Sequence, residues 1–228
     1  MVKKAEIVTV HRVVPDPRPP LSELAELVEK PEDLEELLAL RAMTDPAAAD
    51  ALESLAIVTA ADRYLGPRAA IVMAPFFRLA KSRFSPGTYG VLYSADALPA
   101  AVSESAHHAA RYLGATHAGP TTVPRYALRL NLDATDHVDV RRGGAHDARD
   151  ERIYDPGDYG TAQAHGRRLR NEGHAGVWYD SVRAPGGTCY GTFRPAAVHS
   201  VSDEVRELEL VWDGSRITEY REITTRPL

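Results

Sequence analysis

From residue 69 onward, the apolar residues of this chain come in short runs that have the length of a β-strand. Strands span about four to eight residues, whereas helices usually need about ten or more, so run length helps to separate the two. Two longer segments, 97–113 and 159–171, interrupt the runs and are predicted to be helices. Strands and helices thus mix without strict βαβ alternation, which favours an α+β fold. The predicted strands of this region are 69–77, 89–94, 126–132, 177–181 and 189–193.

Both ends of the chain carry clear local signals. Residues 7–14, IVTVHRVV, are rich in β-branched side chains and are predicted to form an opening strand. Near the C-terminus, the apolar runs LELVW and RITEY flank Asp213-Gly214-Ser215. Because Asp-Gly is a favoured two-residue turn, we predict a C-terminal β-hairpin there.

Between the first strand and residue 69, the pattern is helical. Leucines recur at helical spacing, and Pro31 and Asp45-Pro46 mark two helix starts, where proline is tolerated. We predict two or three helices over residues 21–65, inserted in a single domain that spans residues 1–228. Seven acidic residues and one lysine lie between Glu23 and Glu36. This charge indicates a solvated helical face, with a surface for docking a partner as the alternative.

The composition of the chain excludes several classes of protein. Its 228 residues, 44% of them hydrophobic, are enough for one large domain with a core of its own. The formal net charge of −5 argues against a basic surface that binds nucleic acid directly. The single cysteine, Cys189, excludes internal disulfides and a four-thiolate zinc site. No apolar stretch approaches the length of a membrane span or a signal peptide, so we expect a cytoplasmic protein without membrane contact.

Common motifs of cofactor and metal sites are missing. The sequence has no G-x-G-x-x-G, no Walker loop and no G-x-S-x-G elbow, so nothing predicts Rossmann-type dinucleotide binding. Glu104 and His107 form one Glu-x-x-His unit, whereas a di-iron site needs two, and no metal site is predicted. We expect His107 and His108 to lie on the surface or to be hydrogen-bonded. Cys189 is predicted to be a small buried residue and not a nucleophile.

Residues 82–96 and 178–187 are dense in the side chains that enzymes use, and each contains a Pro-Gly turn that lets backbone approach a ligand closely. The helix after the first segment carries Glu104, which lies about 200° from Val102 and so opposite the apolar stripe. Periodicity alone therefore indicates a solvated glutamate. Alanines on the same side, such as Ala100, would nevertheless permit another layer to pack close. The local pattern alone likewise indicates that Tyr93 is a tyrosine of the core and that Ser181 is a turn residue.

The run from Arg83 through Glu104, followed by the late motif YDSVRAPGG, resembles the RES domain family, which is named for an arginine, a glutamate and a serine. Tyr93 follows Arg83 by ten residues and precedes Glu104 by eleven. The resemblance assigns catalytic positions to Arg83, Tyr93, Glu104 and Ser181. It assigns NAD binding to Arg83, Tyr93, Ser181 and also to Arg12, in an opening HRVV that looks like the family's aromatic-Arg start. One departure is Cys189, where many relatives have asparagine.

The resemblance also implies a fold, an activity and a partner. The fold would be similar to that of ADP-ribosyltransferase toxins, with mixed β-sheets flanked by helices. The activity would be that of a toxin that degrades NAD at the nicotinamide–ribose bond, by hydrolysis or with phosphate as a co-substrate, and without a required cofactor. The partner would be a cognate Xre-type antitoxin in a hetero-oligomer. Two alternatives stay open, namely ADP-ribosyl transfer to a protein target and a non-catalytic interaction protein.

The chemistry of this bond needs only one carboxylate. Its cleavage passes through an oxocarbenium-like ribose, as in glycosidases, but nicotinamide leaves as a neutral molecule and requires no general acid. By resemblance, Glu104 would stabilise the ribosyl cation or orient the nucleophile. Arg83 would grip a phosphate with its fork of N–H donors. Tyr93 would pack against the nicotinamide ring, and Ser181 would hydrogen-bond the nicotinamide-ribose region.

Overall fold

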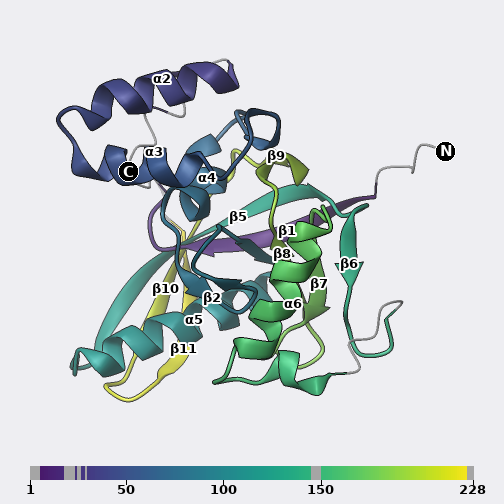
Figure 1. The fold of residues 1–228 in the computed structure, drawn as a ribbon. Helices are drawn as coiled ribbons and strands as arrows, with labels where there is room; N and C mark the ends of the chain where they lie inside the picture. The colour runs from purple at the N-terminus through teal and green to yellow at the C-terminus, as the bar shows by residue number, and fades with distance from the viewer. Residues whose placement is uncertain (1–5, 18–23, 25–26, 29, 145–149, 225–228) are drawn as a thin grey trace.

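A nine-stranded sheet forms the centre of the protein in the computed structural model, which describes residues 6–17, 24, 27–28, 30–144 and 150–224 (Figure 1). Three 3-10 helices, Ala60–Asp62, Glu151–Tyr154 and Pro195–Ala197, join the longer elements. The elements in chain order are β1 (Ile7–Val14), α2 (Pro31–Ala42), α3 (Pro46–Leu55), α4 (Ala69–Phe77), β2 (Lys81–Ser82), β3 (Ser85–Pro86), β4 (Leu92–Ala95), α5 (Leu98–Ala115), β5 (Thr121–Asp133), β6 (His137–Asp139), α6 (Gly160–Asn171), β7 (Gly176–Asp180), β8 (Thr188–Thr192), β9 (Val198–Val201), β10 (Arg206–Trp212) and β11 (Ile217–Ile223).

The sheet is mixed, as predicted for an α+β fold. Its strand order is β11-β10-β5-β1-β4-β8-β7-β6, and β9 also pairs with β5. The β6–β7 pair is parallel and the other pairs are antiparallel. Strand β1 pairs with β5 along its whole length, but it meets β4 at one residue pair, His11 with Ala95. This junction divides the sheet into two halves, β1-β5-β9-β10-β11 and β4-β8-β7-β6.

Most elements lie where the sequence predicts them. Strand β1 has the predicted bounds, β10 and β11 form the predicted hairpin, and α5 and α6 match the two predicted helices to within two residues. Pro31 begins α2, and the Asp45 side chain caps α3 by accepting a hydrogen bond from the backbone N–H of Ala47. The part of the predicted helical region before residue 30 lies mostly outside the described residues.

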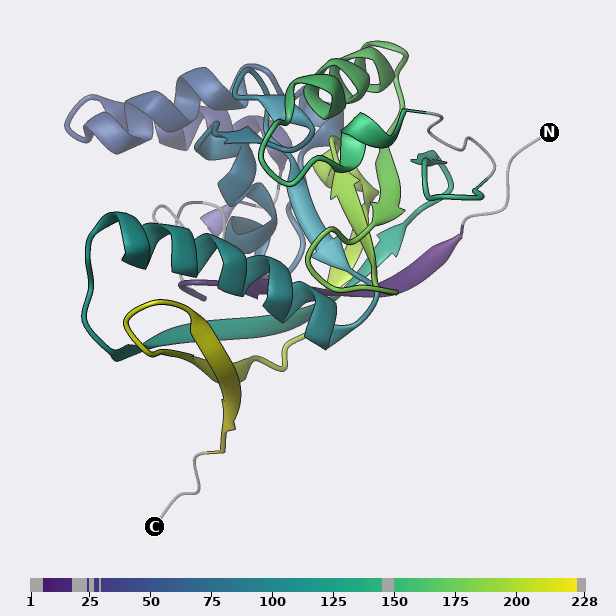
Figure 2. The same ribbon diagram turned by 90° about the horizontal axis from the view of Figure 1, so that it is seen from below.

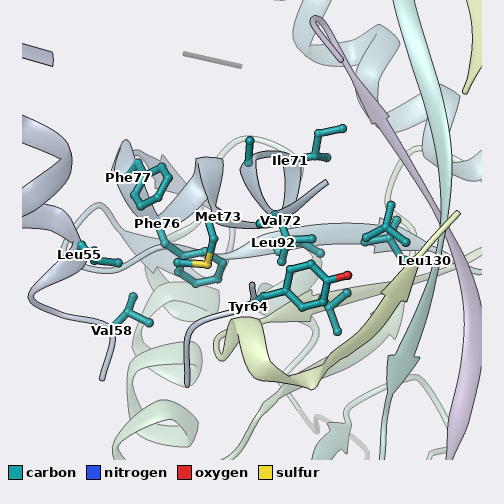
Figure 3. Packing of buried hydrophobic residues seen from close by; sticks show 14 of the residues in the cluster. Leu55, Val58, Tyr64, Ile71, Val72, Met73, Phe76, Phe77, Leu92 and Leu130 are labelled. Atoms are coloured by element: carbon teal, nitrogen blue, oxygen red, sulfur yellow. The ribbon is translucent and has the colours of Figure 1, made fainter. Parts of the chain in front are cut away.

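The predicted strand over 69–77 is wrong, because these residues form helix α4. Seven of its nine residues are buried, on every side of the helix. A helix that is buried all round is apolar all round and loses the 3.6-residue period, so a short apolar run does not distinguish it from a buried strand. Figure 3 shows α4 residues such as Met73 and Phe76 packed between Leu55 of α3 and Leu92 of the sheet. Helix α4 thereby joins α2 and α3 to the domain.

Helix α6 packs against the segment that carries Arg83, and a glycine makes this close contact possible. A Cβ atom added to Gly166 would lie 2.3 Å from the Phe84 carbonyl oxygen and 3.0 Å from Phe84 Cβ.

Gly166→Ala should therefore lower the free energy of unfolding by about 1–3 kcal/mol, the usual cost of overpacking a core. The matched control is Gly114→Ala in α5, where an added Cβ meets nothing within 4 Å. That variant should gain up to about 1 kcal/mol, because alanine is the better helix former. Urea unfolding of both variants checks this, and equal changes would contradict the packing argument.

Candidate active site

A cleft of about 530 Å³ opens at the junction of the two half-sheets, beside helix α5. Its volume falls within the range of pockets that hold small ligands. Figure 2 shows α5 running alongside β1 and β5, and the helix presents one side to the cleft along most of its length. Of the residues predicted from the family resemblance, Arg12, Arg83, Tyr93 and Glu104 line this cleft, and Ser181 contacts Glu104.

Arg12 is a half-buried cation at the junction. Its Nη1 donates a hydrogen bond of 2.8 Å to the Tyr93 carbonyl oxygen, which ties β1 to β4. Its Nε is buried without a hydrogen-bond partner, and no acidic group among the described residues pairs with it. Burial lowers the pKa of Arg12 to about 10, so the side chain stays charged at neutral pH. Since a buried charge without a counter-ion is costly, Arg12 is suited to receive an anion.

Arg83 is buried, unlike Arg12, and part of its guanidinium already makes hydrogen bonds to the protein. Its Nη1 donates to the carbonyl oxygens of Ile153 and Asp155, at 2.9 and 3.0 Å, and its plane lies over the ring of Tyr159 at 4.7 Å. Arg83 therefore holds the 3-10 helix Glu151–Tyr154 in place. Among the described residues, its other two nitrogens have no hydrogen-bond partner, which leaves them available to a ligand.

The hydroxyl of Tyr93 makes its hydrogen bonds within the protein. It accepts a hydrogen bond of 3.0 Å from the backbone N–H of Phe84 and donates one of 2.9 Å to Ser82 Oγ. Burial raises the pKa of Tyr93 to about 12, so the phenol is neutral at physiological pH. Tyr93 thus fixes the position of the Arg83 segment against β4, and only its ring is left to pack against a ligand.

Glu104 and Ser181 meet across the two chemistry-rich segments. Ser181 Oγ donates a hydrogen bond of 2.8 Å to Glu104 Oε1 and accepts from the backbone N–H groups of Arg183 and Ala184, at 3.2 and 3.0 Å. The turn after β7 therefore orients the hydroxyl, and the hydroxyl orients the carboxylate. Glu104 is half-buried, whereas periodicity alone indicates a fully solvated side chain.

The small residues beside Glu104 permit this contact, as the sequence predicts. Ala100 lies so close to the turn after Ser181 that a Cβ added to Gly187 would come within 3.0 Å of the Ala100 side chain. The turn covers the side of α5 opposite the apolar stripe, while Leu98, Val102 and Ala109 of the stripe pack on the other half-sheet. Helix α5 therefore packs against a half-sheet on one side and against the turn after Ser181 on the other. Glu104 lies on the side that faces the turn.

Further residues of the cleft are absent from the predicted set. His107, Arg111 and Tyr112 line it from α5, Arg125 lines it from β5, and Tyr159 lines it beside Arg83. Helical spacing from Glu104, at three, seven and eight residues, is a signal that could have indicated the first three. Arg125 and Tyr159 reach the cleft through the tertiary fold, and no local pattern indicates them.

His107 differs from expectation, whereas His108 does not. His108 is exposed, as predicted. His107 is half-buried, and its Nε2 is buried without a hydrogen-bond partner, so it is neither a surface nor a hydrogen-bonded histidine. Burial, together with nearby arginines such as Arg183, lowers the pKa of His107 to about 4, and the imidazole is neutral at pH 7.

Cys189 lies in the floor of the cleft as a buried free thiol, which confirms the prediction of a small buried residue. Burial raises the pKa of this thiol to about 12. A thiol that stays protonated at neutral pH is a poor nucleophile. Within the described residues there is no group of three or more metal-ligating side chains, and no helix has the length and apolar character needed to cross a membrane.

The sequence matches the RES domain family over residues 57–213, well over half of the chain. The chain belongs to the RES domain family. The RES match contains Arg83, Tyr93, Glu104 and Ser181, whereas Arg12 lies before its first residue. Among solved structures, the chain is similar to one described as the crystal structure of the M. tuberculosis MbcT–MbcA toxin–antitoxin complex, with 16% identity and a TM-score of 0.38 over 63% of this chain and 72% of that chain. No match was found among curated proteins.

Proposed function

We propose that this RES domain protein is an enzyme that cleaves the nicotinamide–ribose bond of NAD, by hydrolysis or by phosphorolysis. The observation that carries the proposal is the charge arrangement of the cleft. Glu104 is the only acidic residue among the described residues that line it, and it shares the cleft with two arginines, the half-buried Arg12 and the buried Arg83. A site with one oriented carboxylate and unpaired arginines is complementary to a substrate that develops one positive charge and carries phosphates.

Glu104 is suited to act on the reacting ribose. As the bond between C1′ and the nicotinamide nitrogen breaks, positive charge develops on the ribose, and a carboxylate held beside it lowers the energy of that state. The bonding electrons leave with nicotinamide, which becomes neutral. Water or phosphate then bonds to C1′, and an attacking water loses its proton to solvent or to Glu104. Ser181 would act here by orienting the carboxylate, since its only hydroxyl hydrogen is directed at Glu104.

The arginines are suited to hold the pyrophosphate. Arg12 lines the cleft as a charged side chain without an acidic partner among the described residues, and Arg83 offers the two nitrogens that make no hydrogen bond there. Charge-assisted hydrogen bonds from arginine to phosphate are among the strongest that proteins make. Tyr93, with its hydroxyl occupied, would contribute a ring face to nicotinamide. No cofactor is needed for this reaction, and phosphate would enter as a co-substrate.

An enzyme that consumes cellular NAD needs restraint, so we further propose that this protein is the toxin of a toxin–antitoxin pair. Its partner would be a cognate Xre-type antitoxin, which would bind the DNA and cover the cleft in a hetero-oligomer. The cytoplasm is the compartment in which such a pair would act. ADP-ribosyl transfer to a protein is the alternative that keeps the same site, because it differs only in the nucleophile that attacks C1′.

Incubation of the purified protein with NAD should release nicotinamide. Mass spectrometry with and without phosphate should find ADP-ribose or its 1″-phosphate ester as the other product. ADP-ribose attached to a protein would instead support the transferase.

Expression of the chain in bacteria should arrest growth and deplete NAD, and co-expression of the cognate antitoxin gene should restore both. Growth equal to that of a Glu104→Gln strain, with normal cellular NAD, would overturn the proposed role as a toxin.

A further inference from the structure

The cleft continues well beyond the residues that would act on the scissile bond. Its lining from α5 begins at Ala101, includes Glu104, and ends at Leu113, twelve residues after the first. At 1.5 Å per residue, this stretch of helix is about 18 Å long. The nicotinamide riboside beside Glu104 would occupy one end only, and the remaining length is free for the other half of the substrate.

The outer end of the cleft, farthest from Glu104 along α5, is lined by aromatic and basic side chains. Tyr112 is an aromatic side chain that is 70% exposed, which is unusual for a residue of its size. Arg111, its neighbour in α5, is exposed and forms no ion pair with any described residue. Arg125 reaches the cleft from β5, where its Nε donates to Ser105 Oγ at 3.1 Å and its Nη1 to the Pro124 carbonyl. Neither arginine has an acidic partner in the described part of the chain.

The chemistry of these side chains fits a purine nucleotide. An exposed aromatic ring stacks on a base with little regard to its identity, and arginines bind phosphates. Sites that require an unmodified adenosine ribose commonly place an acidic residue on its 2′-hydroxyl, which repels a 2′-phosphate. No described residue at the outer end of this cleft is acidic. This end therefore lacks the kind of residue that commonly excludes a 2′-phosphate.

We propose that Arg111, Tyr112 and Arg125 form an outer subsite for the adenosine-phosphate half of a dinucleotide. Tyr112 stacks on the adenine, and the two arginines bind phosphate oxygens. This inference rests on the proposed function, and it adds the direction in which the substrate lies: nicotinamide at Glu104, and adenosine about two turns of α5 farther along. It also widens the substrate class from NAD to its 2′-phosphorylated form, NADP.

The first experiment compares substrates that share the scissile bond. Nicotinamide mononucleotide lacks the adenosine half, so kcat/KM for NAD should exceed that for the mononucleotide by about tenfold or more, the gain expected from one stacked base. Tyr112→Ala and Arg111→Gln should each reduce this ratio by about tenfold. The control Arg167→Gln, on the exposed side of α6, should leave the ratio unchanged. NADP should be cleaved at least as well as NAD.

A second measurement separates this inference from the proposed reaction. ADP carries the adenosine and both phosphates but no scissile bond, and calorimetry should show that it binds the wild type and binds Tyr112→Ala about tenfold more weakly. Equal kcat/KM for NAD and the mononucleotide, exclusion of NADP, or an unchanged ratio in both variants would overturn the subsite while leaving NAD cleavage in place. Failure to cleave any of these compounds would overturn the proposed function, and the ADP result would then decide the subsite by itself.

Discussion

Replacing Glu104 by glutamine should lower kcat for NAD cleavage by about a hundredfold or more, while the affinity for NAD changes only a few-fold. The amide keeps the shape of the side chain and can still accept the hydrogen bond from Ser181 Oγ, so the fold and the cleft should persist. What it lacks is the negative charge, which in the proposed reaction would stabilise a cation that exists only near the transition state. Groups of this kind contribute to kcat rather than to substrate binding.

Steady-state kinetics and calorimetry on the same preparations measure the two effects. The matched control is Glu36→Gln, a change of the same kind on the exposed side of α2, and it should leave both kcat and affinity unchanged. A Glu104→Gln variant with near-normal kcat would remove this carboxylate from the mechanism. A variant that loses kcat and affinity to the same extent would indicate that Glu104 binds the ground state instead.

Replacing Arg12 by glutamine should weaken NAD binding by about tenfold to a hundredfold. Loss of a hydrogen bond to a charged group costs about 1.5–3 kcal/mol, and Arg12 lines the cleft as a half-buried cation with no acidic neighbour among the described residues. The measurement is calorimetric titration with NAD in a Glu104→Gln background, which prevents turnover. Binding equal to that of the background protein would show that the pyrophosphate lies elsewhere.

The Arg83→Gln variant is compared with Arg12→Gln, because Arg83 also holds part of the protein backbone in place. Arg83 Nη1 holds the carbonyl oxygens of Ile153 and Asp155, so its loss should lower the melting temperature as well as the affinity for NAD. Should Arg83→Gln weaken binding without any loss of stability, the contacts to the two carbonyls would be incidental. The sequence resemblance assigns NAD binding to both arginines, and this pair of variants separates their tasks.

The sequence predicts the local elements of this fold well where the local pattern is strong. Strand β1, the C-terminal hairpin, and helices α5 and α6 follow from β-branched runs, an Asp-Gly turn and helical periodicity. Helix α4 does not follow, because its burial on all sides removes the period on which the prediction depends. The limitation is physical, since an element without a solvent-exposed face has no pattern that records its geometry.

The site is predictable only in part, for a related reason. Periodicity correctly places Glu104 opposite the apolar stripe, but the residue that covers it, Ser181, is 77 positions away. The carbonyl partners of Arg83 are 70 and 72 positions away. The family resemblance brings these residues into one hypothesis, although it does not indicate that Tyr93 has a fully occupied hydroxyl. Such facts depend on the tertiary fold and not on spacing.

The single residue pair between β1 and β4 has a consequence for how the site can change over evolution. Arg12 and Arg125 belong to one half-sheet, whereas Tyr93 and the turn of Ser181 belong to the other. The hydrogen bond from Arg12 to the Tyr93 carbonyl spans the boundary between them. The separation of Arg12 and Arg125 from Tyr93 and Ser181 therefore depends on the angle at which the two half-sheets meet. A substitution that changes this angle would move these groups relative to one another, even where the substituted residue lies outside the cleft.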